Sequence, residues 1–286
     1  MLIDSPANPT VKLLRSLAAG PRQRREVGLF LAEGVRVITD ALDAGWVPHV
    51  CLYEREALHK TERGRALRTR LEVIARSETA RIFEATQRAI AATSDTQHPQ
   101  GVVAAFPMPD RPQPSAPTKP ALALVCDDIQ DPGNLGAILR AAEASGVDAV
   151  WLTERCVDLY SPKVVRAAMG AHFRLPSFPE AAWGDIVAAL ARLDIPAANI
   201  YAAEADARKT YDEVNWLVPS ALIVSNEAHG LGEDARRLAT RGGGLLAIPM
   251  LGGTESLNAA VATAVILFEA ARQRRVGQPP PAGEVG

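Results

Sequence analysis

The chain has 286 residues, of which 48% are hydrophobic and 22% are charged, and its formal net charge is −2. This length accommodates two ordinary domains, and the composition predicts a folded chain with a buried core and without a strongly basic coat. No apolar run approaches the ~18 residues that span a bilayer, and the N-terminus lacks the layout of a signal peptide, so we expect no membrane association.

Residues 1–106 are predicted to form a small α/β domain. The pattern indicates a short helix at about 8–18, then an arginine-rich turn. It indicates a helix at 35–45 that Gly45 stops. Strands are predicted at 28–34, 47–53, 70–76 and 100–106.

The N-terminal end of this domain is basic. Residues 1–27 hold five basic side chains against two acidic ones, a net of +3, which leaves −5 for the rest of the chain. The basic residues are Lys12, Arg15, Arg22, Arg24 and Arg25. Such an asymmetry is typical of a protein with a polyanionic partner, and a solvated helix face explains the charge equally well.

A proline-rich stretch marks the domain boundary. Residues 107–120, "PMPDRPQPSAPTKP", contain six prolines in fourteen residues. Proline disfavours helix and sheet interiors, so this stretch is predicted to be a semi-rigid linker. A second domain is expected over residues 121–275, followed by a disordered tail at 276–286.

The second domain alternates predicted strands and helices. Buried strands are expected at 121–127, 148–153, 221–227 and 245–250. Helices are expected after Gly133, at 161–170 with Ser161 as N-cap and Pro162 at the first position, and at 257–275. An apolar stripe on the last helix comprises Leu257, Val261, Val265 and Phe268. This alternation predicts a parallel sheet covered on both faces.

The three cysteines do not suggest a metal site or a disulfide. Cys51, Cys126 and Cys156 are far apart, odd in number and not at metal-ligand spacing. We expect them to be reduced and mostly buried, in a cytoplasmic protein.

Polar residues follow three of the predicted buried strands. The turn "DPGNLG" holds Asn134 and fits neither the dinucleotide fingerprint nor the P-loop, and Arg140 follows in the next helix. Glu227 follows the strand "ALIV", while Ser256 and Asn258 open the last helix. Ligands of open α/β sheets bind at the carboxyl ends of the strands, so these five residues are predicted to converge on one crevice. Helix capping by Ser256 and an Arg140 stem that reaches solvent are the simpler interpretations of each residue alone.

With these motifs in view, the sequence resembles the SpoU/TrmH family of RNA ribose 2′-O-methyltransferases, within the SPOUT superfamily. The resemblance is carried by "DPGNLGAILRAAEASG", "IVSNEAHGLG" and "IPMLGGTESLNAAVATAVILFEAARQ", with "SPKVVRAAMGAHFRLP" between them. The first domain, with "GLFLAEGVRVITDAL" and "QHPQGVVAAF", is similar to the substrate-binding domain of many members.

The resemblance implies a small N-terminal RNA-binding domain and a C-terminal SPOUT domain with a trefoil knot. It also implies a homodimer with active sites at its interface, S-adenosyl-L-methionine (AdoMet) as cofactor, and no metal. The positions that match the family's catalytic set are Asn134, Arg140, Glu227, Ser256 and Asn258. Those that match its cofactor contacts are Ser225, Ile248 and Leu257.

Two residues depart from what the family or the chemistry would suggest. Ser225 stands where the family usually has glycine, and its Cβ is expected to crowd the cofactor. A left-handed backbone there would add a conformational cost. Arg140 matches the position for which a proton-accepting role has been proposed in the family. An arginine stays protonated, so orienting an RNA phosphate or stabilising developing negative charge is the easier role.

The predicted function is therefore AdoMet-dependent 2′-O-methylation of RNA ribose, with 23S rRNA as the expected substrate. Methylation of tRNA and non-catalytic RNA or ribosome binding on the same fold are the alternatives. A nucleotide-dependent oxidoreductase is disfavoured, because the glycine fingerprint is missing.

Overall fold

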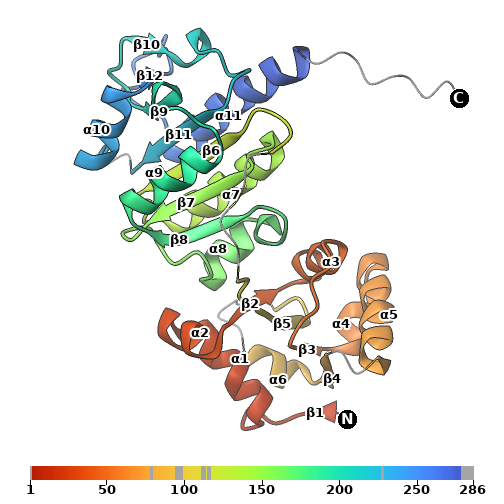
Figure 1. Cartoon of the computed structure of the whole chain (residues 1–286). Coiled ribbons are helices and arrows are strands. Elements are labelled where there is room, and N and C mark those ends of the chain that lie inside the picture. Colours follow the sequence, from red (N-terminus) through yellow and green to blue (C-terminus); the bar gives the residue numbers. More distant parts are fainter. Residues whose placement is uncertain are drawn as a thin grey trace, which may run out of the picture. The chain divides into compact units, whose positions relative to one another are not determined.

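A computed structural model of the protein describes residues 2–77, 80–93, 99–110, 114, 117–226 and 229–277 (Figure 1). The chain forms two compact units. The first comprises residues 1–110 and 158–174, and the second comprises residues 111–157 and 175–286. Both are mixed α/β structures, as the sequence predicts. Parts of the expected linker, and residues 278–286 of the expected tail, lie outside the described residues.

The first unit is built on a five-stranded mixed sheet with the strand order β1-β4-β3-β5-β2. The strands are β1 (Leu2–Ile3), β2 (Leu29–Glu33), β3 (Val50–Tyr53), β4 (Arg81–Ala85) and β5 (Val102–Pro107). The helices are α1 (Pro9–Ala19), α2 (Pro21–Val27), α3 (Val35–Asp43), α4 (Arg55–His59), α5 (Glu62–Arg76), α6 (Gln87–Ala91) and α8 (Pro162–Ala167). Apolar residues of α1, α6 and the sheet form one buried cluster.

Two secondary-structure expectations for this unit are wrong. Residues 70–76 are not a strand but the end of α5, in which Leu67 and Leu71 are buried and spaced as one helical face. Thr61 caps that helix by accepting a hydrogen bond from Gly64 N at 3.0 Å. The arginine-rich turn is the helix α2, which Gly28 ends in a left-handed conformation with φ of 68°.

The segment 158–174 folds with the first unit although more than 50 residues separate it from residue 106. Its helix α8 packs against β2, and Ser161 caps α8 as the sequence predicts. Trp46 Nε1 donates a hydrogen bond to Phe173 O at 2.9 Å. Aromatic rings from both parts of the unit pack together, namely Phe30, Trp46, Phe106, Tyr160, His172 and Phe173.

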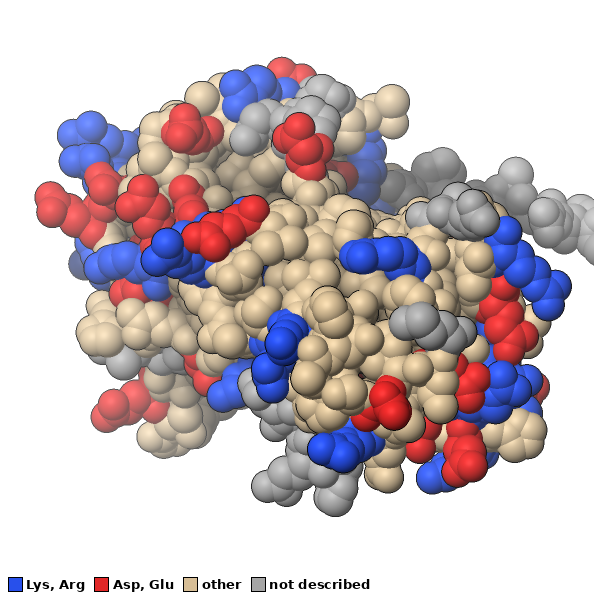
Figure 2. Space-filling model, turned by 90° about the horizontal axis from the view of Figure 1, so that it is seen from below, with Lys and Arg blue, Asp and Glu red and all other residues tan. Residues whose placement is uncertain are grey.

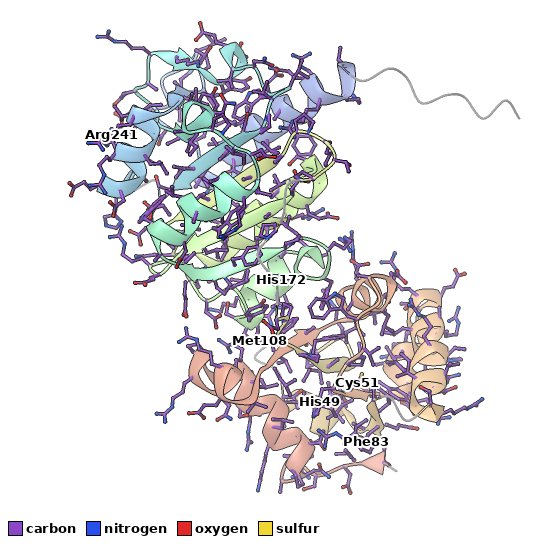
Figure 3. The ribbon with its side chains drawn as sticks, viewed as in Figure 1. His49, Cys51, Phe83, Met108, His172 and Arg241 are labelled. Carbon is purple, nitrogen blue, oxygen red and sulfur yellow. The ribbon has the colours of Figure 1, made fainter. Side chains whose placement is uncertain are left out.

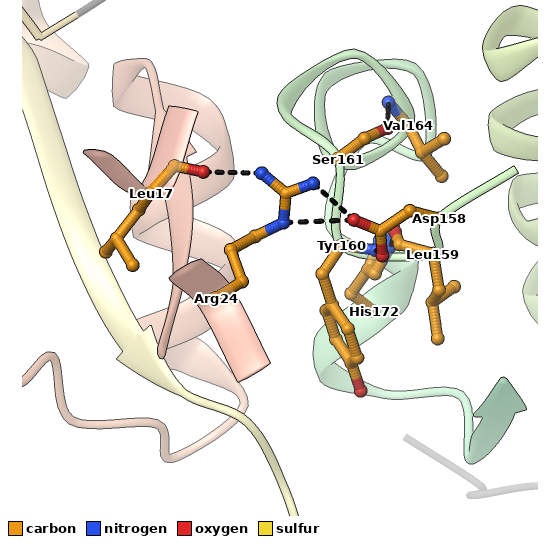
Figure 4. Close-up of polar contacts among 8 residues, drawn as sticks. All are labelled: Leu17, Arg24, Asp158, Leu159, Tyr160, Ser161, Val164 and His172. Atoms are coloured by element: carbon orange, nitrogen blue, oxygen red, sulfur yellow. Dashed lines mark hydrogen bonds and ion pairs between the residues drawn. The ribbon is translucent and has the colours of Figure 1, made fainter. Parts of the chain in front are cut away.

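Arg24 joins α2 to this segment and does not belong to an exposed basic cluster. Its side chain is buried, with the residue only 2% exposed, and its guanidinium donates to the Asp158 carboxylate and to Leu17 O (Figure 4). The Nε–Oδ2 distance to Asp158 is 3.0 Å. Arg24 is therefore wrongly placed in the basic cluster expected to face a polyanionic partner, whereas Lys12, Arg15, Arg22 and Arg25 are exposed.

Arg24→Met should destabilise the protein by about 3 kcal/mol, because it leaves the Asp158 carboxylate without its buried cation. Thermal and denaturant unfolding would measure the loss. Arg22→Met is the matched control, since Arg22 is exposed and forms an ion pair with Glu26 on the same helix. Equal stability of the two variants would contradict the assigned role of Arg24.

The second unit is built on a seven-stranded parallel sheet with the order β10-β12-β9-β11-β6-β7-β8. The strands are β6 (Leu122–Asp127), β7 (Ala149–Thr153), β8 (Ser177–Ala181), β9 (Ile200–Ala203), β10 (Lys209–Thr210), β11 (Ser220–Ser225) and β12 (Gly244–Ala247). The helices are α7 (Pro132–Ser145), α9 (Trp183–Arg192), α10 (Glu233–Arg241) and α11 (Ala259–Val276). The parallel sheet predicted from the alternating pattern is confirmed.

Helices cover both faces of this sheet (Figure 1). Helices α9 and α10 bury Ile186, Leu190 and Ala235 against alternate residues of β6, β7, β9 and β11. On the other face, α7 packs along α11. The sequence therefore positions the start of α7 and the start of α11 on the same face of the sheet.

The end of α11 is fixed by one arginine. Arg274 donates hydrogen bonds to four backbone carbonyls, those of Pro120, Ala121, Trp216 and Val218, at 2.7–3.2 Å. Burial lowers the pKa of this guanidinium. The carbonyls flank the starts of β6 and β11, so Arg274 links the last helix to the two central strands.

Arg274→Met should lower the free energy of unfolding by about 2 kcal/mol, because buried carbonyls lose charge-assisted hydrogen bonds while the apolar stem remains. Denaturant unfolding would measure the change. Arg275→Met, at the neighbouring exposed position, is the control and should cost little. A loss for Arg274→Met no larger than for the control would show that these bonds do not hold the helix.

The cysteines are free, as predicted. Cys51 in β3 and Cys126 in β6 are buried, and Cys156 is partly buried. Cys51 lies within its strand, two residues after His49 (Figure 3). Burial raises the pKa of all three thiols, which makes them poor nucleophiles.

No helix among the described residues is long and apolar enough to cross a membrane. The same residues contain no group of three or more His, Cys, Asp or Glu side chains that could hold a metal ion.

Candidate cofactor pocket and polar pair

A pocket lies beyond the carboxyl ends of β9, β11 and β12, beside the first turns of α11. It contains about 730 Å³ of empty space, including the space at its open mouth. The predicted residues Ser225, Ile248, Ser256 and Leu257 all line it. Four residues that converge from three separate stretches of sequence are thus brought together, at the edge of the sheet where α/β proteins bind ligands.

The walls of this pocket differ in chemistry. Apolar side chains include Leu231, Leu246, Ile248, Leu257 and Ile266. Polar groups come from Ser225, Asn226, Glu204 and Ser256. AdoMet carries an apolar adenine ring at one end and hydroxyl, amino and carboxylate groups elsewhere. The residues present therefore fit that cofactor, with the apolar wall for the base and the polar groups for the ribose and methionine parts.

The glycine-to-serine departure at residue 225 carries no backbone cost. Ser225 is the last residue of β11, and its φ does not lie in the left-handed region. Serine adopts an extended backbone as readily as glycine, so the additional conformational penalty considered from the sequence is absent. Only the side chain distinguishes Ser225 from glycine at this wall of the pocket.

Asn134 and Asn258 form a hydrogen-bonded pair between the starts of two helices. Asn258 Nδ2 donates to Asn134 Oδ1 at 2.9 Å. Asn258 Oδ1 accepts from Ala260 N and Val261 N at 3.0 and 3.3 Å, which makes Asn258 the N-cap of α11. Asn134 lies in the first turn of α7, whose N-cap is Asp131.

This arrangement corrects the expected start of the last helix. Ser256 does not cap it; Asn258 does, and Ser256 lines the pocket instead. An asparagine is as good an N-cap as a serine, so sequence preference alone could not separate them.

Arg140 lies apart from the pair within this chain. A helix turns by about 100° per residue, so Arg140, six positions after Asn134, points about 120° away from it. It shares an exposed face of α7 with Gly133, Ala137 and Ala144. The described residues that line the pocket do not include Arg140. Glu227, the fifth predicted catalytic residue, lies outside the described residues.

The sequence missed several pocket residues. Ala203, Glu204 and Ala205 line it at the end of β9, a strand that the sequence reading did not identify. The sequence does contain the pattern used for the other strand ends, because Glu204 is a polar residue directly after the short apolar run at 200–203. Glu204 also accepts a hydrogen bond from Arg236 at 2.6 Å.

Comparison with known families covers most of the chain. Residues 121–268 match the SpoU rRNA methylase family, and residues 8–104 match the MRM3-like substrate binding domain. The fold, the pocket and these matches define the class: the chain belongs to the SpoU rRNA methylase family.

Two sequence relatives extend over both domains. The mitochondrial rRNA methyltransferase 3A of Danio rerio is 34% identical over 303 residues, which cover 90% of this chain and 67% of that protein. A 23S rRNA (guanosine(2553)-2'-O)-methyltransferase of Bacillus subtilis is 30% identical over 266 residues, covering 93% and 97% of the two chains.

Two solved structures of similar methyltransferases share this fold over nearly the whole chain. An AdoMet-bound rRNA methyltransferase from Sinorhizobium meliloti superimposes with a TM-score of 0.81 at 29% identity, covering 95% of this chain and 97% of that one. The SpoU methyltransferase AviRb from Streptomyces viridochromogenes, in complex with AdoMet, gives 0.80 at 28% identity, covering 94% and 100%.

The asparagine pair can be tested by separating its two roles. Asn258→Ser should retain the helix cap and nearly all the stability, yet lose the contact with Asn134 and slow methyl transfer at least about tenfold. Asn258→Ala should lose the cap as well and cost about 1 kcal/mol of stability. Unfolding curves and single-turnover transfer rates would check both expectations, and a fully active Asn258→Ser protein would contradict a role for the pair.

Proposed function

We propose that this protein transfers the methyl group of AdoMet to a ribose 2′-hydroxyl of RNA, with 23S rRNA as the substrate. The observation that carries the proposal is the pocket lined by Ser225, Ile248, Ser256 and Leu257, at the carboxyl edge of the sheet and beside the first turns of α11. The AdoMet-bound neighbours and the rRNA methyltransferase relatives support the cofactor and the substrate class.

Methyl transfer from AdoMet requires few chemical groups from the protein itself. AdoMet, when bound, supplies a methyl group that its sulfonium has already activated. The protein must hold a ribose hydroxyl in line and assist loss of its proton. We assign positioning of the ribose to Asn134, Asn258 and Ser256, and we include Glu227 in the set on the strength of the family motif. Arg140 provides a fixed positive charge that can orient an RNA phosphate or stabilise developing alkoxide charge.

We propose that the active form is a homodimer. Val261 and Phe268 of α11 remain 48% and 50% exposed, with Val265 between them half-buried. The neighbouring helix α7 exposes small residues on either side of Arg140. A second copy of the chain can cover this apolar stripe, and it would then bring Arg140 to an active site at the interface. The resemblance to the SpoU/TrmH family supports both the homodimer and a trefoil knot in the C-terminal part of the second unit.

Phe268→Glu should convert the dimer into a monomer at micromolar concentration, because it buries a charge in the interface, a loss of at least about a hundredfold in affinity. Light scattering would measure the mass. Val187→Glu, at an exposed position of α9, is the control and should remain dimeric. A monomeric wild-type protein would contradict the proposed assembly.

Arg140→Ala should slow single-turnover methyl transfer at least about a hundredfold, close to 2.7 kcal/mol of barrier, while fold and AdoMet affinity are kept. A rate within about threefold of wild type would remove Arg140 from the mechanism.

A second experiment asks whether Arg140 acts on the pocket of its own subunit or on that of the partner subunit. The Arg140→Ala protein is mixed with an Ile248→Arg protein, in which the new side chain blocks the pocket. If Arg140 acts across the interface, random mixing should restore about a quarter of wild-type activity.

The first unit is proposed to bind the RNA. Exposed Lys12 and Arg15 on α1 can neutralise phosphates, and the match to a substrate-binding domain supports this role. Acidic and basic side chains are interspersed on the face seen in Figure 2, so charge on that face does not mark a continuous RNA track. We place the protein in the cytoplasm, in keeping with its free cysteines.

The experiment that tests the function uses AdoMet with a labelled methyl group. Purified protein is incubated with 23S rRNA, with tRNA, and without RNA, and methylated riboses are mapped by their resistance to alkaline cleavage. Label at one ribose of 23S rRNA supports the proposal. Transfer to tRNA alone would replace the substrate, and RNA binding without AdoMet binding would replace the enzyme by an RNA-binding protein.

A further inference from the structure

Two described parts of one pocket wall, at the end of β11 and just before α10, meet at a single buried carboxylate. Ser225, the last residue of β11, is paired in register with Asp127, the last residue of β6. Seven residues later, Gly232 N donates a hydrogen bond to Asp127 Oδ2 at 3.1 Å. The chain thus leaves the sheet beside Asp127 and returns to it, which closes the loop at its base.

The carboxylate is itself held in one orientation. Asp127 is 2% exposed, and its Oδ1 accepts a hydrogen bond from Thr153 Oγ1 of β7 at 3.1 Å. Thr153 Oγ1 in turn accepts from Asp128 N at 3.2 Å. Asp128 takes a left-handed backbone with φ of 57°, so the chain turns away from the strand directly after Asp127. Both oxygens of this buried carboxylate therefore have a fixed partner.

The close approach of the loop requires a glycine. A Cβ added at Gly232 would lie 2.7 Å from Asp127 Oδ2 and 3.4 Å from a guanidinium nitrogen of Arg155. The first distance is shorter than any non-bonded contact to a Cβ allows. Since Gly232 has no side chain, its amide can reach the carboxylate.

Described residues on both sides of this anchor face the pocket, whereas Asp127 does not line it. Ser225, Asn226, Gly230 and Leu231 are pocket-lining residues, and Gly230 N donates to Asn226 O at 2.9 Å. We propose that Asp127 is a positioning residue for AdoMet binding, which holds Ser225 on one side and Gly230, Leu231 and Gly232 on the other in place as part of the cofactor pocket wall. This inference rests on the proposed function, because it takes AdoMet as the ligand of that pocket.

The consequence is a specific effect on affinity. Without the carboxylate, Gly230, Leu231 and Gly232 lose their anchor on β6, and AdoMet binding must then order them at a cost in affinity. Once AdoMet is bound and these residues are ordered, the groups that act on the ribose are unchanged. Loss of the Asp127 contact should therefore raise the Kd and KM for AdoMet while leaving kcat nearly constant.

The experiment measures AdoMet affinity by calorimetry on the full-length protein, and KM and kcat with RNA at saturation. Asp127→Leu, which keeps the side-chain volume, should raise the Kd for AdoMet about tenfold or more with kcat within about threefold. Asp127→Asn should bind nearly as wild type, because its amide oxygen can still accept from Gly232 N while its NH₂ donates to Thr153 Oγ1. Gly232→Ala keeps Asp127 but pushes the loop from it, and should also weaken binding.

A stability control separates positioning from general loss of folding. Arg274→Met destabilises the same unit away from the pocket and should leave the Kd for AdoMet unchanged. Wild-type affinity for AdoMet in both Asp127→Leu and Gly232→Ala would overturn this inference and leave the proposed function standing. The same holds if Arg274→Met weakens AdoMet binding as much as those two variants do. A wild-type protein that does not bind AdoMet would overturn the proposed function and, with it, this inference.

Discussion

The in-register pairing of β6 with β11 is the constraint on which the second unit depends. The pairing runs over six residues, from Leu122 with Ser220 to Asp127 with Ser225. Because both strands are parallel and end together, the two turns that follow them start side by side. One turn enters α7 through Asn134, and the other forms a wall of the pocket. Helix α11 packs along α7 and completes the site through Asn258.

The segment 158–174 shows that family boundaries and folding units differ in this protein. It lies inside the stretch 121–268 that matches the methylase family, yet its buried contacts are with residues of the first unit. The Arg24–Asp158 pair and the aromatic cluster around Phe30 stabilise it there. A truncation at residue 106 would therefore remove partners of this segment as well as the proposed RNA-binding residues, so surface substitutions such as Lys12→Gln probe RNA affinity more cleanly.

The architecture of the second unit could be predicted because its central strands are continuous apolar runs that alternate with predicted helices, a pattern typical of a buried parallel sheet. Strands β8 and β9 were missed because the first contains Pro179 and Glu180 and the second is four residues long. Residues 70–76 contain the β-branched Val73 and Ile74, which favour a strand locally, but Leu67 and Leu71 continue a helical spacing. At the site, strand ends could be predicted, but which side chains meet depends on helix rotation, as Asn134 and Arg140 show.

The most direct test of the central claim is hydrogen exchange of the backbone amides with and without AdoMet. We expect slower exchange on AdoMet addition at residues 229–231 and 248–257, which include pocket-lining residues, with β6 and the first unit unchanged. Protection confined to the first unit, or no protection at these residues under saturating AdoMet, would contradict the assignment of this pocket as the cofactor site.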